Sequence, residues 1–201
     1  MKTLVLGIGN VLWADEGFGV RCVEALAQRY SFDAEVTLLD GGTQGLYLVD
    51  VVGAHQQLLV FDAIDWGDEP GALRVVRDAE VPKFTGAKKM SLHQTGFQDV
   101  LSAADLLGRL PSRVTLVGVQ AGELEDFGGS LTPRVSAKVE HALNVALDEL
   151  RAWQVQPRVR TTPVPSMLGP GLDRFSYETG RPSEQVACRQ GDERFFAGAA
   201  R

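Results

Sequence analysis

Acidic and imidazole side chains follow apolar segments at three widely separated places in the sequence. Glu16 comes after the first apolar segment, Asp62 comes after the third, and His93 lies at the start of a later amphipathic stretch. Two carboxylates and one imidazole provide two oxygen ligands and one nitrogen ligand, which suit a divalent ion of borderline hardness such as Zn, Ni, Mn or Fe. A cation with open coordination positions polarises a carbonyl group and lowers the pKa of bound water, so this set predicts hydrolytic chemistry.

Each of these residues also has an ordinary structural explanation. Glu16 can occupy the first turn of a helix, where an acid is favoured, and Asp62 can cap a turn after its strand. His93 can be a surface histidine, as we expect for His55 and His141, which have no acidic neighbours at strand ends. Both explanations stay open here, and the metal site is favoured because all three residues fall on the same predicted edge.

The glycines before Glu16 raise a different possibility, a dinucleotide-binding turn. Gly7-x-Gly9 follows the first apolar segment, and Asp40 closes the second segment at the position of a ribose-binding acid. However, Leu12 replaces the third glycine of that motif, and carboxylates follow where a pyrophosphate needs backbone N–H groups. We therefore expect no phosphate at this turn, and we expect its glycines to let the backbone approach a bulky partner, a protein substrate.

Continuous apolar segments alternate with stretches of helical periodicity. The apolar segments predict strands at Thr3–Leu6, Glu35–Leu39, Leu58–Phe61 and Val114–Val119, and only a short extended ribbon at Leu73–Val76. The periodic stretches predict helices at Gly17–Tyr30, Gln44–Val52, Ser91–Leu107 and Thr132–Trp153. Ser91 with Gln94 fits a capping box, and Thr132 before Pro133 fits an N-cap.

This alternation predicts a three-layer α/β/α fold, in which a mainly parallel, twisted sheet of about five strands is flanked by helices. In such a sheet the carboxyl ends of the parallel strands meet at one edge, where ligands bind. The same edge would collect Glu16, Asp40, Asp62 and His93.

The composition of the chain changes near Gln154. Residues 154–201 contain five of the nine prolines, seven arginines and little apolar periodicity. We therefore expect an α/β domain at residues 1–153 and an irregular or disordered C-terminal extension at residues 154–201.

Charge and composition exclude several classes of partner. The net charge of −6 and the isoelectric point near 5.1 leave no electrostatic footprint for nucleic acid or an anionic membrane. No apolar run is long enough to cross a bilayer, so no membrane insertion is expected. Cys22 and Cys188 form no metal-binding spacing, Cys22 is expected in the core, and no signal peptide is recognisable, so we expect a cytoplasmic protein.

Five segments together resemble the hydrogenase maturation protease family, the endopeptidases that trim the C-terminus of the large subunit of nickel–iron hydrogenases. The segments are LVLGIGNVLWADEGFGVRCVEAL, LLDGGTQG, LLVFDAID, SLHQTGFQDVLSAADLLG and TLVGVQ. They occur in the family's order between about residue 2 and residue 153, roughly three-quarters of the chain. The resemblance leaves residues 154–201 without a counterpart.

The resemblance also implies roles for particular residues. The family's metal-binding trio falls on Glu16, Asp62 and His93, and Asp40 matches an aspartate implicated in activity or substrate recognition. The nickel belongs to the substrate, a large-subunit precursor that must hold nickel before it is cut, so we expect nickel to come from that precursor rather than to be tightly bound by the isolated protein. Neither the attacking nucleophile nor a general base follows from the resemblance.

Two alternatives remain at the level of sequence. A non-catalytic metal-handling or chaperone module that binds the hydrogenase precursor would use the same three ligands. A nucleotide-dependent oxidoreductase is the third reading, which NAD(P) or flavin binding would test.

Overall fold

The computed structural model describes the backbone of residues 1–81 and 92–180, together with their side chains except those of residues 92–96. This part of the chain contains a five-stranded sheet in the order β3-β1-β4-β6-β5. The strands are β1 (Thr3–Ile8), β3 (Val36–Gly42), β4 (Gln57–Ile64), β5 (Leu73–Arg77) and β6 (Arg113–Gln120). Four of them run parallel and β5 runs antiparallel to β6, so the expected mainly parallel sheet is confirmed.

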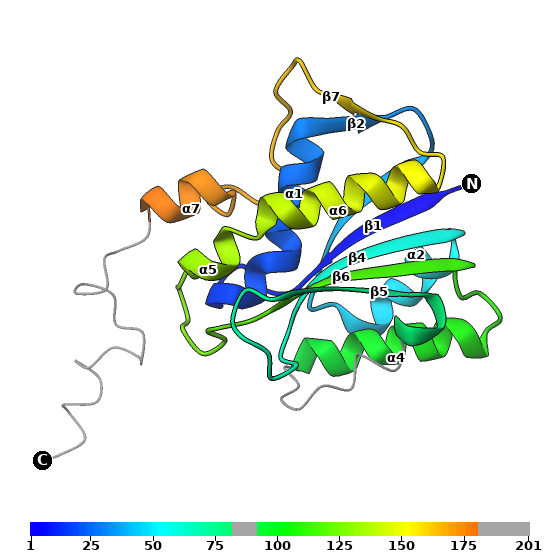
Figure 1. The fold of residues 1–201 in the computed structure, drawn as a ribbon, viewed down its shortest axis with the longest axis horizontal. Helices are drawn as coiled ribbons and strands as arrows, with labels where there is room; N and C mark the ends of the chain where they lie inside the picture. The colour runs from blue at the N-terminus through cyan, green and yellow to red at the C-terminus, as the bar shows by residue number, and fades with distance from the viewer. Residues whose placement is uncertain (82–91, 181–201) are drawn as a thin grey trace, which may run out of the picture.

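Helices cover both faces of this sheet (Figure 1). One face packs against α1 (Phe18–Arg29) and α6 (Val139–Ala152), and the other packs against α2 (Val49–Gly53) and α4 (Leu92–Leu106). The side chains of each strand alternate between these two cores, because successive residues of a strand point to opposite faces. The expected three layers are therefore present.

The parallel register brings the carboxyl ends of the strands to one edge of the sheet. Gly7 of β1 is level with Asp40 of β3 and Phe61 of β4. Helix α1 begins at this edge, since it follows β1 after a short connection that includes η1 (Ala14–Gly17). Helix α4 begins at the same edge and runs back toward the amino end of β6 (Figure 1).

Three predicted elements differ from the observed ones. The single helix predicted at Gln44–Val52 is divided into the 3-10 helix η2 (Gly45–Leu48) and the short helix α2. The segment predicted as a ribbon is β5, which joins the sheet as its antiparallel edge strand. The long helix predicted from Thr132 is divided into α5 (Pro133–Ser136) and α6, and the Thr132 side chain makes no capping hydrogen bond. The capping box that starts at Ser91 lies outside the described residues.

The described part of the C-terminal extension is ordered against the first helix. Strand β7 (Pro157–Val159) pairs antiparallel with β2 (Tyr30–Phe32), and α7 (Arg174–Gly180) follows. Residues 154–180 thus contain a strand and a helix where the sequence predicts an irregular or disordered extension. The reason is that β7 depends on a distant partner strand, which local periodicity does not reveal. Residues 181–201 lie outside the described residues, and the division at residue 153 stays a prediction.

Another short element is η3 (Asp78–Glu80). Cys22 is buried in the core between α1 and the sheet, as expected, and carries a free thiol. No helix in residues 1–81 and 92–180 is both long enough and apolar enough to cross a membrane.

Candidate active site at the carboxyl edge of the sheet

Glu16 lies in η1, on the connection between β1 and α1, and the glycine directly after β1 makes its position possible. Gly9 has φ +128°, and a Cβ atom there would lie 1.8 Å from the carbonyl oxygen of Glu16. Only glycine tolerates this φ and this contact, so Gly9 lets the connection fold back onto the end of β1. The space beside Gly9 is thus filled by the backbone of Glu16. Whether the turn as a whole approaches a protein substrate stays a prediction.

The neighbouring acid, Asp15, has a structural role. Its side chain is fully buried and accepts hydrogen bonds from the backbone N–H groups of Gly122 (2.9 Å) and Glu123 (3.0 Å), and from Thr132. It therefore joins the β1–α1 connection to the segment after β6, and fixes Glu16 from the adjacent position. Sequence reasoning missed this structural role of Asp15. The only sign of it in the sequence is the pair of adjacent acids, Asp15 and Glu16.

Asp62 lies within β4 rather than after it, because the strand continues to Ile64. Its side chain is 3% exposed. Along β4 it has the same parity as Leu58 and Val60, which pack into the core beneath α2 and α4. Asp62 therefore faces the layer that contains α4, the helix that carries His93.

Trp66 is a neighbour of Asp62 that sequence reasoning did not identify. Gly118 of β6 is the register partner of Asp62, and a Cβ atom at Gly118 would lie 2.2 Å from the Trp66 ring. The indole therefore covers the strand directly beside Asp62. The guanidinium carbon of Arg74 lies 5.1 Å from the centroid of this ring, a cation–π contact.

The two carboxyl groups are close enough to influence one another. Burial raises the pKa of Glu16 from 4.5 to about 7. Burial also raises the pKa of Asp62 well above its ordinary value, a hydrogen bond from the Ala63 backbone lowers it, and the negative charge of Glu16 raises it further. The structure thus brings together two of the three predicted ligands, and their environment disfavours two bare negative charges.

His93 lies in the first turn of α4, at the carboxyl edge, but its side chain is outside the described part of the structure. Among the residues with described side chains, no group of three His, Cys, Asp or Glu residues is arranged to hold a metal ion. His93 is not among these residues, so the complete trio stays a prediction.

Asp40 lies on the other side of β1 from Asp62, because β1 separates β3 from β4 in the sheet. Two strand spacings correspond to roughly 10 Å. Asp40 Oδ1 accepts a hydrogen bond from the Gly42 N–H group at 2.8 Å. Burial raises the pKa of Asp40, this hydrogen bond lowers it, and the charges of Glu24 and Arg21 raise and lower it respectively.

Asp40 borders a cavity of about 230 Å³, here called the Asp40 cavity. The segment after β1, the first turn of α1 and the end of β3 form most of its wall. The lining residues are Gly9, Asn10, Val11, Leu12, Val20, Asp40, Gly42, Thr43 and Leu172. The cavity therefore lies at the carboxyl edge, beside the connection that carries Glu16.

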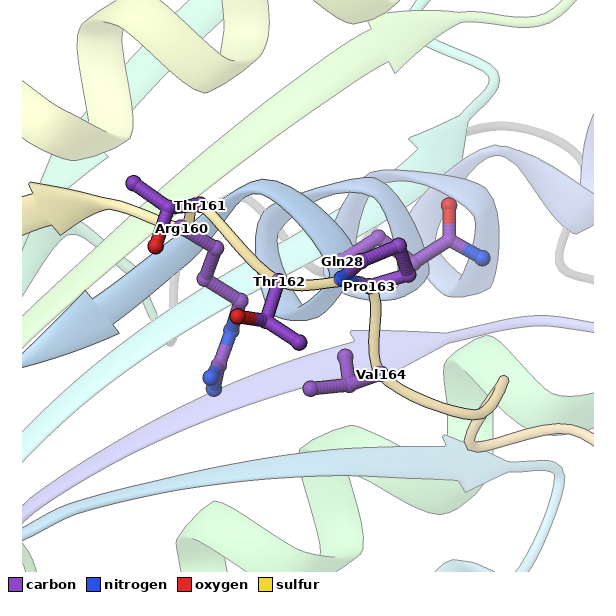
Figure 2. Close-up of a pocket in the computed structure, with 6 residues that line it drawn as sticks. All are labelled: Gln28, Arg160, Thr161, Thr162, Pro163 and Val164. Carbon is purple, nitrogen blue, oxygen red and sulfur yellow. The ribbon is translucent and has the colours of Figure 1, made fainter.

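A larger cavity, of about 400 Å³, lies at the opposite end of α1 (Figure 2). It is lined by Gln28 and by the extension residues 160–164. Since α1 starts at the carboxyl edge and Gln28 is near its end, this cavity is remote from Glu16. Size alone therefore does not identify the functional site.

Comparison with known proteins shows that this chain is similar to hydrogenase maturation proteins. Residues 20–149 match the family described as hydrogenase maturation protease. The hydrogenase expression/formation protein HupD of Rhodobacter capsulatus is 56% identical over 200 residues, which cover 100% of this chain and 95% of the relative. The corresponding protein HoxM of Cupriavidus necator is 56% identical over 196 residues, which cover 96% of this chain and 97% of the relative.

Among solved structures, the hydrogenase maturating endopeptidase HybD from Escherichia coli is similar with a TM-score of 0.76 and 44% identity. The match covers 99% of that chain but 80% of this one. The C-terminal extension does have a counterpart, because the alignment with HupD covers all of this chain.

Proposed function

Because the chain belongs to the hydrogenase maturation protease family, and is therefore an endopeptidase that processes the precursor of a hydrogenase large subunit, we propose that its carboxyl-edge site engages a nickel ion carried by that precursor. The nickel is part of the substrate, and the isolated protein does not hold it tightly. Engagement of the ion places the C-terminal peptide segment of the precursor for cleavage. The family favours this activity over the alternative of a non-catalytic chaperone module.

The observation that carries the proposal is the pairing of Glu16 with Asp62. Both carboxyls have raised pKa values, and the charge of one raises the pKa of the other. A divalent cation offered by the substrate would stabilise both ionised forms and remove this repulsion. The pair is thus suited to a cation that arrives with the substrate.

His93 is the third ligand in this proposal. Helix α4 starts at the carboxyl edge and lies on the face of the sheet toward which Asp62 points. A neutral imidazole beside two carboxylates completes a donor set that suits nickel.

The residues of the chain bind and orient the substrate around this ion. When bound, such a cation polarises a carbonyl group and lowers the pKa of water. Asp40 is held by the Gly42 N–H group at the rim of the Asp40 cavity, and in the proposal it orients the substrate or a water molecule there. We place this reaction in the cytoplasm, in keeping with the free thiol of Cys22.

A trimming assay tests the proposal. The purified protein is incubated with nickel-loaded large-subunit precursor, and the precursor is followed by intact mass. Glu16→Gln, Asp62→Asn and His93→Ala should each fold and each fail to shorten the precursor. His141→Ala, on the exposed surface of α6, is the matched histidine control and should trim normally.

Two results would contradict the proposal. Normal trimming by all three variants would remove the proposed site. A wild-type protein that binds the loaded precursor and never shortens it would instead support the chaperone alternative.

A further inference from the structure

The Asp40 cavity contains one residue that does not come from the carboxyl edge. Most of its wall is formed by the residues after β1 and at the end of β3, but Leu172 belongs to the C-terminal extension. Leu172 follows the Pro170–Gly171 turn and precedes α7. The extension therefore reaches the rim on which Asp40 lies.

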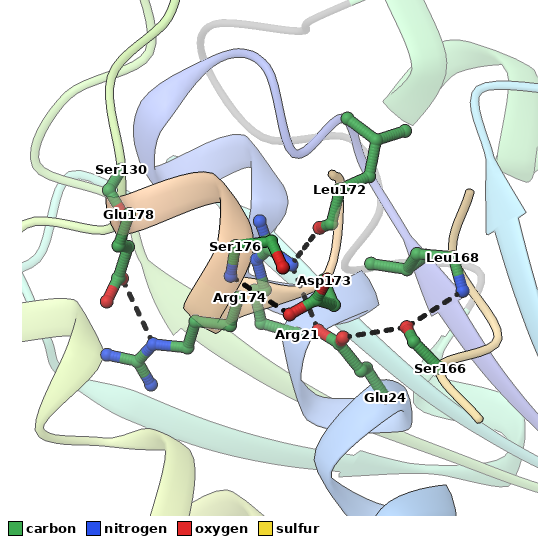
Figure 3. A network of polar contacts seen from close by, with 10 residues as sticks. All are labelled: Arg21, Glu24, Ser130, Ser166, Leu168, Leu172, Asp173, Arg174, Ser176 and Glu178. Atoms are coloured by element: carbon green, nitrogen blue, oxygen red, sulfur yellow. Dashed lines mark hydrogen bonds and ion pairs between the residues drawn. The ribbon is translucent and has the colours of Figure 1, made fainter. Parts of the chain in front are cut away.

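The backbone of Leu172 is held by a buried guanidinium. Arg21 Nη1 donates a hydrogen bond of 2.6 Å to the Leu172 carbonyl oxygen (Figure 3). Leu172 N also donates a hydrogen bond of 3.0 Å to Gly169 O. Arg21 comes directly after Val20, which also lines the cavity. The position of Leu172 is thus fixed by the same turn of α1 that forms the cavity wall.

Arg21 is itself held by Glu24, one helical turn later. The two side chains form an ion pair of 3.0 Å, and they are 4% and 3% exposed. Figure 3 shows Ser166 beside Glu24, where the Ser166 hydroxyl donates a hydrogen bond to Glu24 Oε1 at 3.0 Å. The ring of Tyr177 covers Arg21 with its centroid 5.5 Å from the guanidinium carbon.

Together these contacts hold the Leu172 side chain in the wall of the Asp40 cavity. Buried charges are stabilised only when their partners satisfy them, so Arg21 and Glu24 require the extension in its present position. The exposed residues of α7, such as Phe175 at 78% exposure, take no part in the cavity. Leu172 is the extension residue that enters the wall.

We propose that Leu172 is a specificity-determining residue, and that the Asp40 cavity receives one side chain of the precursor polypeptide against it. The cavity of about 230 Å³ is smaller than the roughly 300–1,000 Å³ of typical small-molecule sites, and it matches a single residue of a bound chain. Its apolar wall, formed by Val11, Val20 and Leu172, contacts the stem of that side chain. The inference rests on the proposed function, because it needs the precursor as the bound partner.

The experiment compares Leu172→Ala and Leu172→Trp with the control Phe175→Ala. The dissociation constant for nickel-loaded large-subunit precursor is measured by titration, and KM and kcat are measured by trimming. Loss of an apolar contact in a pocket costs about ten-fold or more in binding, so Leu172→Ala should raise KM and the dissociation constant by about that factor. Leu172→Trp should fill the cavity and weaken binding at least as much, while kcat, the thermal midpoint and the control stay at wild-type values.

Each outcome separates the two proposals. Unchanged KM and dissociation constants in both Leu172 variants would overturn the role of Leu172. Wild-type protein that binds the precursor without trimming it would defeat the proposed function alone, and the dissociation constants would still decide the role of Leu172. Wild-type protein that does not bind the precursor at all would overturn the inference about Leu172.

Discussion

Asp15 and Thr132, 117 positions apart in the chain, are joined by two hydrogen bonds. The Thr132 N–H group donates to Asp15 Oδ1 at 2.7 Å, and its hydroxyl donates to Asp15 Oδ2 at 3.0 Å. The hydroxyl that would otherwise cap α5 is therefore used to hold the connection before α1. Through this contact, the start of α5 supports the segment that carries Glu16.

Asp15→Asn should destabilise the protein. The amide replaces one acceptor oxygen by a donor that faces N–H and hydroxyl donors, and unsatisfied buried polar groups of this kind cost about 1–3 kcal/mol. The free energy of unfolding, measured by urea denaturation, should fall by about that amount. Asp105→Asn, at an exposed position of α4, should change it little, and an equal effect of both variants would contradict the role of Asp15.

Gly9→Ala should be more disruptive than an ordinary glycine substitution. Its methyl group would lie 1.8 Å from Glu16 O, whereas a Cβ atom at Gly67, which has φ +76°, meets nothing within 4 Å. Gly67→Ala should lower the free energy of unfolding by only about 1–2 kcal/mol, the cost of a left-handed conformation for a residue with a side chain. Gly9→Ala should lower the free energy of unfolding, measured by urea denaturation, by more than this amount, and the variant should no longer trim the precursor. Equal losses would show that the contact with Glu16 is unimportant.

Stability should depend on pH through Glu16. Its pKa is about 7 in the folded protein and returns to about 4.5 when the chain unfolds. Between these values the folded protein holds more protons than the unfolded chain, so the free energy of unfolding falls as pH rises through this range. Asp62, whose pKa is also raised, contributes with the same sign.

Glu16→Gln should therefore flatten the pH dependence. The variant removes the Glu16 titration and one cause of the raised Asp62 pKa, so it should lose less stability than the wild type as pH rises from 4.5 to about 7. Urea denaturation across this range measures the difference. Asp99→Asn removes an equal charge from an exposed position of α4 and should retain the wild-type slope. Parallel curves for wild type and Glu16→Gln would contradict the prediction.

Nickel should bind weakly to the isolated protein. Two carboxylates and one imidazole, without a thiolate, provide few ligands, and the affinity should rise when the precursor adds its own. Metal content after extensive dialysis should therefore be far below one nickel per chain. Stoichiometric retention by the wild type, lost in Asp62→Asn, would show instead that the chain holds its own ion.

The central sheet was predictable because its strands are continuous apolar segments. The continuous apolar run Leu58–Phe61 predicts a buried strand. Several such runs between amphipathic helices predict a parallel sheet. The exact end of that strand was not predictable, because Asp62 continues β4 although a carboxylate usually ends an apolar run. The burial of Asp62 depends on the helical layer that packs on this face of the sheet, and that layer comes from residues distant in sequence.

The site was predictable only in outline. Parallel topology predicts that Glu16 and Asp62 lie at the same edge, and the charge of Glu16 does raise the pKa of Asp62. Their convergence with His93 on one metal ion stays a prediction. The contact between Gly9 and Glu16 was not predictable, since only the folded chain shows that the Glu16 backbone fills the space beside Gly9. Leu172 gave no signal, because its place in the cavity depends on a hydrogen bond from Arg21 across the fold.

The contact between the extension and α1 also has a consequence for biosynthesis. Arg21 and Glu24 leave the ribosome well before Ser166, Leu172 and Tyr177, which cover them. Until then this pair of charges stays hydrated on the nascent domain. The Asp40 cavity therefore acquires its last wall only after Leu172 has been synthesised, and a chain that stops short of this residue would present an open rim.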